Sequence, residues 1–273
     1  LDPNNATPVY DDAETVYKDL ISRLSSDIDM ITTGASSFGS ADLFYGGNAE
    51  MWKKFAASLK FRMAMRLADY DSEYSQQMAN QALSAGVYED QKNSAIFKFT
   101  ATPPHTHSIY DWFSLQGRKD VVPTSVFAQT LDSLNDPRLP YVIDTTTGPA
   151  QPYAIAVDAY SGVAHFQDQF FEPDFQHVFI DYVEMEFLKA EAVERGGYDV
   201  TGTAEEHYNN AIRASISHWG GTLDPPVPNA TLDSVATAYL AQNEVNYATA
   251  GGTWREKIGL QKWIALYNRG CES

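Results

Sequence analysis

Residues 51–86 have the sequence MWKKFAASLKFRMAMRLADYDSEYSQQMANQALSAG, and residues 181–220 have the sequence DYVEMEFLKAEAVERGGYDVTGTAEEHYNNAIRASISHWG. Each stretch predicts a helix, a turn and a second helix that ends at glycine. The second helices share four aligned positions, which are Tyr74 and Tyr208, Met78 and Ile212, Ala82 and Ile216, and Gly86 and Gly220. The chain therefore contains a repeated helix pair.

The repeat predicts the architecture of the scaffold. Helix pairs of about 34 residues are the unit of tetratricopeptide arrays, in which no unit buries its apolar face alone and neighbouring units must stack. We therefore predict a mainly α fold in which tetratricopeptide-like helix pairs form a scaffold. On its own, this architecture favours a scaffold that binds a protein partner in its helical groove, without a small ligand.

The composition excludes several classes of partner. The chain has 273 residues, with 19 Lys and Arg against 36 Asp and Glu, and its net charge of −17 would repel phosphate backbones and anionic lipid. We therefore expect no nucleic-acid partner. Aromatic residues make up 13% of the chain, which is typical of surfaces that bind flat ligands and also of helix-pair cores. The single cysteine, Cys271, cannot form an internal disulfide, and no run of 18 apolar residues predicts a membrane-spanning helix.

Outside the repeat, the sequence predicts further helices and a long irregular region. Amphipathic spacing predicts a helix over 11–32, and Asn48 is placed to cap a helix over 50–69. Residues 95–100 (AIFKFT) alternate as a short strand would, and 100–122 form a long connection rich in Pro, His and aromatic residues. The remaining expected elements are a helix over 124–134, a turn at 135–138, an aperiodic stretch over 141–177, and helices over 231–243 and 253–268.

We predict that the chain forms a single domain over 1–273, because neither charge nor composition shifts sharply along it. The helical scaffold would consist of 9–86 and 179–268. A loop-rich insert with few short strands, over 87–178, would interrupt this scaffold. Long connections in compact proteins are usually functional or disordered, so the insert is the expected ligand-binding region.

Four phrases of the sequence are similar to phrases of one known family. They are FYGGNAEMWKKFAASLKFRMAMRLAD, FIDYVEMEFLKAEAVERGG, AEEHYNNAIRASISHWGG and WREKIGLQKWIALYNRG. In this order they resemble the SusD/RagB nutrient-binding lipoproteins of Bacteroidetes outer membranes. The resemblance extends from about Pro8 to the end of the chain. It implies tetratricopeptide-like helix pairs as a scaffold on which an irregular region holds the ligand, in agreement with the repeat.

The resemblance also implies a function and a location. Proteins of this family capture a glycan, or less often a peptide, at the cell surface and cover a TonB-dependent, SusC-like outer-membrane transporter. They are surface lipoproteins without a catalytic group. Family members are usually longer and begin with a lipidated cysteine. Because this sequence begins at Leu1 rather than Met, we expect a processed or truncated product whose anchor lies outside it.

The long connection contains the main candidate binding site. Tyr110, Asp111, Trp112 and Phe113 are consecutive, and Arg118 follows. Aromatic rings on a loop stack on the apolar face of a sugar, while Asp and Arg side chains bond its hydroxyl groups. We predict ligand binding by these five residues. The competing interpretation is that the loop folds back and that Trp112 and Phe113 pack on the scaffold.

A second candidate site lies in the Gly-rich connection over 34–47. Phe44 and Tyr45 follow Asp42 there, where a connection would ordinarily be polar. We predict that the two aromatic residues contribute to ligand binding. Packing beneath the helix over 50–69 is the competing interpretation. Tyr153 and Tyr160, in the aperiodic stretch, are further candidates that rank below these two sites.

No sequence pattern indicates catalysis or metal binding. Glu184, Glu186 and Glu191 lie on one predicted helix, but Glu184 and Glu186 are two positions apart and face different ways, so we expect a solvated flank rather than paired catalytic carboxylates. His105 and His107 share a face in an extended segment, but no Cys, Glu or third His lies at a helpful spacing. We therefore predict a binding protein with no catalytic residue, no metal and no cofactor.

Overall fold

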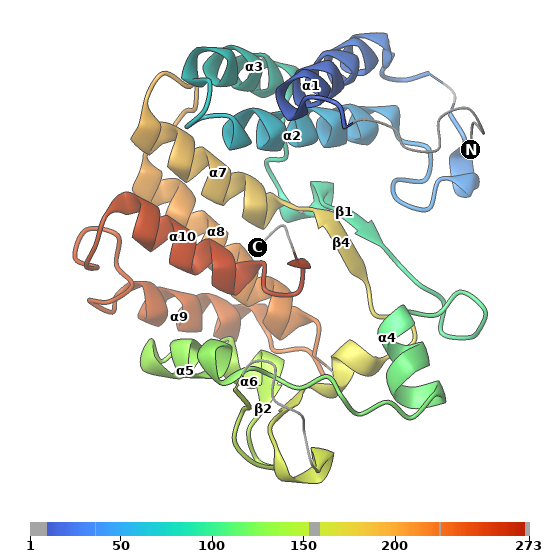
Figure 1. Cartoon of the computed structure of the whole chain (residues 1–273), viewed down its shortest axis with the longest axis vertical. Helices are drawn as coiled ribbons and strands as arrows, with labels where there is room; N and C mark the ends of the chain where they lie inside the picture. Colours follow the sequence, from blue (N-terminus) through green and yellow to red (C-terminus); the bar gives the residue numbers. More distant parts are fainter. Residues whose placement is uncertain (1–9, 36, 153–158, 224, 271–273) are drawn as a thin grey trace. The chain divides into compact units, whose positions relative to one another are not determined.

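The structure, a computed structural model, describes residues 10–35, 37–152, 159–223 and 225–270. The chain divides into two compact units. Unit 1 holds the described residues up to Tyr88 together with Gly197–Asp199, and unit 2 holds the other described residues. Figure 1 shows that both units are built mainly from helices, so the predicted mainly α class is confirmed. The organisation as a single domain stays a prediction.

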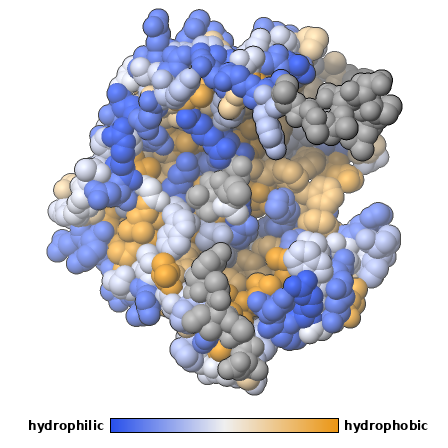
Figure 2. Space-filling model, in the orientation of Figure 1, coloured by the Kyte–Doolittle hydropathy of each residue, from blue (hydrophilic) through white to orange (hydrophobic). Residues whose placement is uncertain are grey.

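Unit 1 is a group of three long helices. They are α1 (Ala13–Met30), α2 (Ala49–Arg66) and α3 (Ser72–Ala85), with a short 3-10 turn η1 (Gly39–Ala41) between the first two. Each helix begins at a side chain that accepts hydrogen bonds from the free N–H groups of the first turn, namely Asp12, Asn48 and Asp71. The predicted cap at Asn48 is therefore confirmed. In Figure 2 the surface that α1 and α3 present is mostly hydrophilic, and Ile21 and Ile28 of α1 and Met78 of α3 are buried.

Unit 2 contains the second helix pair and the insert. Its helices are α4 (Ser108–Tyr110), α5 (Ser125–Ser133), α6 (Leu139–Val142), α7 (Tyr182–Arg195), α8 (Ala204–Gly221), α9 (Asn229–Leu240) and α10 (Trp254–Ala265). Its short helical turns are η2 (Gln91–Asn93), η3 (Asp111–Leu115), η4 (Tyr160–Gly162) and η5 (Asp168–Phe171). Two antiparallel strand pairs complete it, β1 (Ala95–Phe97) with β4 (His177–Ile180) and β2 (Ile143–Asp144) with β3 (His165–Phe166).

The main core of unit 2 lies between its four long helices. Helix α7 packs on α8 and α10, and α8 also packs on α9. Large apolar side chains from all four helices meet there, among them Phe187, Tyr208, Ile212, Leu232, Tyr239 and Ile258. This stacking buries the apolar faces that the repeated pair could not bury alone.

Gly220 does not end a helix as the repeat predicts. Helix α8 continues to Gly221, and a Cβ atom on Gly220 would lie 2.3 Å from Cδ2 of Leu232 on α9. The glycine therefore allows α8 and α9 to approach closely. Gly86, in contrast, follows α3 with φ of 94°, and the predicted helix end at this residue is confirmed.

A buried ion pair joins the predicted turn at 135–138 to the helices. Two nitrogens of Arg138 donate to Asp136, from Nε to Oδ1 over 2.9 Å and from Nη2 to Oδ2 over 2.6 Å. Arg138 also donates to Ser215 of α8 and Gln261 of α10, and Tyr239 of α9 donates to Asp136. Burial alone would raise the pKa of Asp136, but the Arg138 charge and the hydrogen bonds hold it below its usual value. The turn is thereby tied to three helices.

The predicted solvated flank of α7 is wrong. Glu184 and Glu186 are only 1% and 2% exposed. Arg269 lies 3.5 Å from Glu184, while Lys189 and His207 each lie 2.8 Å from Glu186. Helix α7 packs against α8 and α10, so Glu184 and Glu186 are buried, and their partners Arg269 and His207 come from distant parts of the sequence.

The close approach at Gly220 generates a stability prediction. Gly220→Ala places a methyl group against Leu232, and we expect it to lower the free energy of unfolding by about 1–3 kcal/mol. Gly221→Ala is the matched control, because its Cβ atom meets nothing within 4 Å. This control should leave the free energy unchanged or raise it by up to about 1 kcal/mol. Urea unfolding followed by circular dichroism measures both, and equal effects would contradict the explanation.

The buried ion pair generates a second stability prediction. Arg138→Met leaves the Asp136 carboxylate buried without its partner, and we expect a loss of about 3–5 kcal/mol in the free energy of unfolding. Arg213→Ala, which removes the exposed pair with Asp233, should cost at most about 1 kcal/mol. Chemical denaturation of the two variants measures the difference. A loss of similar size in both would show that burial of the Arg138 pair is unimportant.

Candidate functional site

The predicted main site lies on a helical segment of the long connection. This segment was expected to be irregular, but it contains α4 and the π-helical turn η3, which carries Asp111, Trp112 and Phe113. The N–H of Gln116 donates to the carbonyl of Asp111 over 3.0 Å, which closes the wide turn. Oγ1 of Thr106 donates to Oδ1 of Asp111 over 2.6 Å. A segment this short has no periodicity in sequence, and π-helical turns are frequent at functional sites.

Phe113 anchors the segment on other parts of the insert. Its ring stacks on Phe171, with centroids 3.8 Å apart and ring planes at 16°. It also meets the ring of Tyr160 edge-on at 5.5 Å, and Tyr160 stacks on His165 at 3.8 Å. Trp112, which precedes Phe113, has 46% of its surface exposed. We call Trp112, Phe113 and Tyr160 the loop aromatic cluster.

Two cations lie over the rings of the loop aromatic cluster. The Arg118 guanidinium lies 5.7 Å from the ring centre of Trp112, and Nζ of Lys119 lies 3.0 Å from that of Phe113. Arg118 also forms an exposed ion pair with Asp120, from Nη2 to Oδ2 over 2.5 Å. The Arg118 hydrogen bond lowers the pKa of the Asp120 carboxyl, which therefore carries a charge. An exposed ring thus has hydrogen-bond donors and an acceptor beside it.

The structure brings together only some of the predicted residues. Arg118 lies over the Trp112 ring, and Phe113 follows Trp112 in the same turn, whereas Tyr110 is half-buried on α4. Phe113 is packed against Phe171, whereas Trp112 is exposed, and ligand binding by the predicted residues stays a prediction. Lys119 and Tyr160 also belong to this region. Tyr160 is far from Trp112 in sequence, so no spacing could associate the two, and Tyr153 lies outside the described residues.

The second predicted site lies in unit 1 and is held by one carboxylate. Asp42 accepts from the Trp52 indole over 2.7 Å and from the N–H of Gly47 over 2.8 Å. Burial would raise the pKa of Asp42, but these hydrogen bonds hold it below its usual value. Phe44 and Tyr45 pack against the Trp52 ring at 5.8 and 5.3 Å. Ligand binding by Phe44 and Tyr45 stays a prediction.

An apolar pocket adjoins this second site. Its volume is about 670 Å³, and its wall includes Phe38, Leu43, Phe44 and Trp52. Phe38 and Leu43 are both strongly exposed. The Asp42 carboxylate also lies on the wall, but its oxygens are already engaged by Trp52 and backbone N–H groups. The free surface of this pocket is therefore mainly apolar.

The described residues contain neither a metal cluster nor a helix suited to a membrane. No three His, Cys, Asp or Glu side chains among them lie close enough to hold a metal ion. Of the two histidines considered as ligands, His107 is buried with its ring against Phe99 and Phe175, and burial lowers its pKa. Among the same residues, no helix is long and apolar enough to cross a bilayer.

Comparison with known proteins identifies the family. Residues 1–273 match the model of the SusD-like family, which is described as starch-binding and associating with the outer membrane. The chain belongs to this family. The resemblance found in the four sequence phrases is thereby confirmed. No curated protein sequence matches the chain.

Solved structures show the same SusD-like fold. A chitin-binding SusD homologue from Flavobacterium johnsoniae aligns over 97% of this chain and 59% of its own, with 24% identity and a TM-score of 0.77. An outer membrane protein from Bacteroides vulgatus aligns over 98% and 63%, with 20% identity and a TM-score of 0.82. A SusD homologue from Bacteroides fragilis aligns over 96% and 62%, with 21% identity and a TM-score of 0.78. The chain thus spans about three fifths of the length of these proteins.

The contrast between the two adjacent rings generates a prediction. Phe113→Ala removes the stacked contact with Phe171, so we expect the free energy of unfolding to fall by about 2–3 kcal/mol. Trp112→Ala removes a ring that is nearly half exposed and should cost at most about 1 kcal/mol. Thermal and urea unfolding compare the variants. A larger loss for Trp112 would contradict the assignment of Phe113 as the anchor.

Proposed function

We propose that this protein binds a neutral oligosaccharide at the cell surface through the loop aromatic cluster. The observation that carries the proposal is the Trp112 ring, which is 46% exposed on a segment that Phe113 anchors. Sugar rings present an apolar face of C–H groups that packs on an aromatic ring. A ring that is held in place before the sugar arrives loses little conformational freedom on binding.

The polar side chains beside Trp112 suit the hydroxyl groups of such a ligand. Arg118 supplies N–H donors, and the charged Asp120 supplies acceptor oxygens. Both side chains are more than half exposed, so a sugar can exchange hydrogen bonds with them in place of water. Tyr110, Asp111 and Phe113 complete the proposed site, with Phe113 and Asp111 holding the segment that presents Trp112.

Charge and family membership narrow the ligand class. The net charge of −17 favours a neutral glycan over a polyanionic one. The family is described as starch-binding, and one structural neighbour is described as chitin-binding. Both polymers consist of uncharged sugars. We therefore propose an uncharged, starch-type or chitin-type oligosaccharide as the ligand.

We further propose that the protein acts as an outer-membrane surface lipoprotein with a TonB-dependent, SusC-like transporter as its partner. The family's description as associating with the outer membrane supports this location. The role is binding rather than catalysis. Glu184 and Glu186, two of the carboxylates considered for hydrolysis, are buried and engaged by basic side chains, which supports a protein without catalytic function.

A binding experiment tests the role of Trp112. Calorimetric titration with maltohexaose and chitohexaose should give saturable binding of at least one of them. Trp112→Ala should weaken this binding at least tenfold, since stacking contributes about 1.4 kcal/mol or more. Phe179→Ala is the matched control, because Phe179 is 48% exposed in the same unit but lies outside the proposed site, and it should bind as the unchanged protein does.

Two outcomes would contradict the proposal. Equal weakening by Trp112→Ala and Phe179→Ala would remove the argument for the loop aromatic cluster. If neither hexasaccharide binds, the result would favour the competing hypotheses. These are a tetratricopeptide-like scaffold for a protein partner and a peptide-binding member of the same family.

A further inference from the structure

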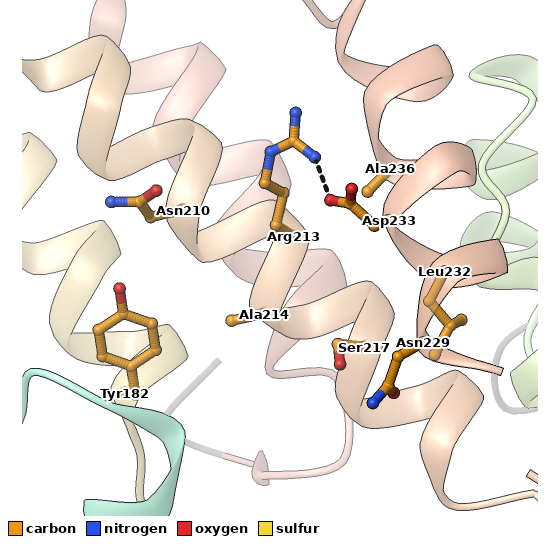
Figure 3. A pocket seen from close by; sticks show the side chains of 9 residues that line it. All are labelled: Tyr182, Asn210, Arg213, Ala214, Ser217, Asn229, Leu232, Asp233 and Ala236. Carbon is orange, nitrogen blue, oxygen red and sulfur yellow. Dashed lines mark hydrogen bonds and ion pairs between the residues drawn. The ribbon is translucent and has the colours of Figure 1, made fainter. Parts of the chain in front are cut away.

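Unit 2 contains a pocket that shares no residue with the loop aromatic cluster. It has a volume of about 380 Å³, within the range of about 300–1,000 Å³ that is usual for small-molecule sites. Figure 3 shows α8 crossing the middle of this pocket, with α9 on one side and Tyr182, at the start of α7, on the other. We call it the α8–α9 pocket. Its wall consists of Tyr182, Asn210, Arg213, Ala214, Ser217, Asn229, Leu232, Asp233 and Ala236.

Several polar side chains on this wall can form hydrogen bonds with a ligand. The side chains of Tyr182, Ser217 and Asn229 make no hydrogen bond to the described part of the chain. The Asn210 amide donates to Glu186 over 3.2 Å, which orients the amide and leaves its oxygen on the pocket side as an acceptor. These residues come from three different helices, so the wall presents hydrogen-bonding groups from several directions.

The two charges on the wall compensate one another. Nη1 of Arg213 donates to Oδ1 of Asp233 over 3.0 Å and to Oγ1 of Thr237 over the same distance. An anionic ligand drawn to Arg213 would also face Asp233, and a cationic ligand drawn to Asp233 would face Arg213. A neutral ligand meets neither repulsion. It can accept from the guanidinium and donate to the free carboxylate oxygen at the same time.

The rest of the wall is apolar. Ala214 on α8 and Leu232 and Ala236 on α9 form this part, and the half-buried Tyr182 ring adds an aromatic side. Small residues at two of these positions leave room above the helices. A pocket with an apolar surface and a rim of donors and acceptors matches a sugar ring, which has C–H groups on its faces and hydroxyl groups at its edge.

We propose that the α8–α9 pocket is a second saccharide site that holds an uncharged sugar unit. The choice of ligand class rests on the proposed function, since both sites would take the same uncharged glycan, each independently of the other. The two sites differ in construction. The first presents an exposed ring on a loop, whereas the second is formed by side chains on three packed helices and needs no rearrangement of the backbone.

A substitution that fills the pocket tests this proposal. Ser217 is exposed on α8 and lines the pocket, so Ser217→Trp should block it without disturbing the core. Ser234→Trp is the matched control, because Ser234 is exposed on α9 and does not line the pocket. Binding is followed by NMR, using the side-chain amide signals of Asn210 and Asn229. The probes are maltohexaose, chitohexaose and, as an anionic sugar, glucuronate.

The expected result is a saturable shift of the Asn210 and Asn229 signals with at least one hexasaccharide. Ser217→Trp should weaken this binding at least tenfold, and Ser234→Trp should leave it unchanged. The shifts should persist in Trp112→Ala, which lacks the central ring of the first site. Glucuronate should bind the pocket at least tenfold more weakly than the neutral probe.

The remaining outcomes overturn the proposal in distinguishable ways. Shifts near Trp112 without any at Asn210 and Asn229 would refute the second site and leave the proposed function intact. Shifts at the two asparagines that vanish in Trp112→Ala would refute an independent site. Stronger binding of glucuronate would show an anion site at Arg213. No saturable shift anywhere with either hexasaccharide would refute the proposed function together with the second site.

Discussion

The architecture of unit 2 depends on the buried ion pair between Asp136 and Arg138. Both residues are removed from water, which costs several kcal/mol for each unpaired charge, and only a fully satisfied geometry offsets this cost. Asp136 and Arg138 form hydrogen bonds with each other and with side chains of α8, α9 and α10. The turn that leaves α5 can therefore take one position on the helical scaffold. Moving the turn would leave these buried charges without their hydrogen-bond partners. The insert is therefore attached to the helices at a defined place.

The two proposed sites use the rigidity of unit 2 in different ways. At the loop aromatic cluster, Phe113 holds the segment by stacking on Phe171 and leaves its neighbour Trp112 open to solvent. At the α8–α9 pocket, the packing of the long helices itself fixes the wall, and Gly220 permits the close approach of α9. Both sites pair one cation with one carboxylate, Arg118 with Asp120 and Arg213 with Asp233. Such compensated charges suit an uncharged ligand with many hydroxyl groups.

Much of the helical scaffold follows from local pattern. Asn48 lies within four residues of the N–H groups that its side chain bonds, so the sequence alone locates this cap. The repeated helix pair and the four phrases that resemble the family are also stretches of consecutive residues, so they can be found in the sequence alone. Trp112, Phe113 and Arg118 are near one another in sequence, whereas Tyr160 is not, so the sequence could not place Tyr160 beside Phe113. The burial of Glu186 was missed, since its partner His207 belongs to the next helix.

The sequence by itself determined the class of fold, the helix pairs, the helix start at Asn48 and the family. The fold class, the helix pairs and the cap depend on the periodicity of apolar residues and on hydrogen bonds between close neighbours in the chain, whereas the family was found from the four phrases that resemble it. Only the tertiary structure decided that Gly220 is a point of close approach, that Phe113 is an anchor while Trp112 is exposed, and that the α8–α9 pocket exists. The physical reason is that burial, close packing and charge pairing depend on residues that are distant in sequence and meet only when the helices stack.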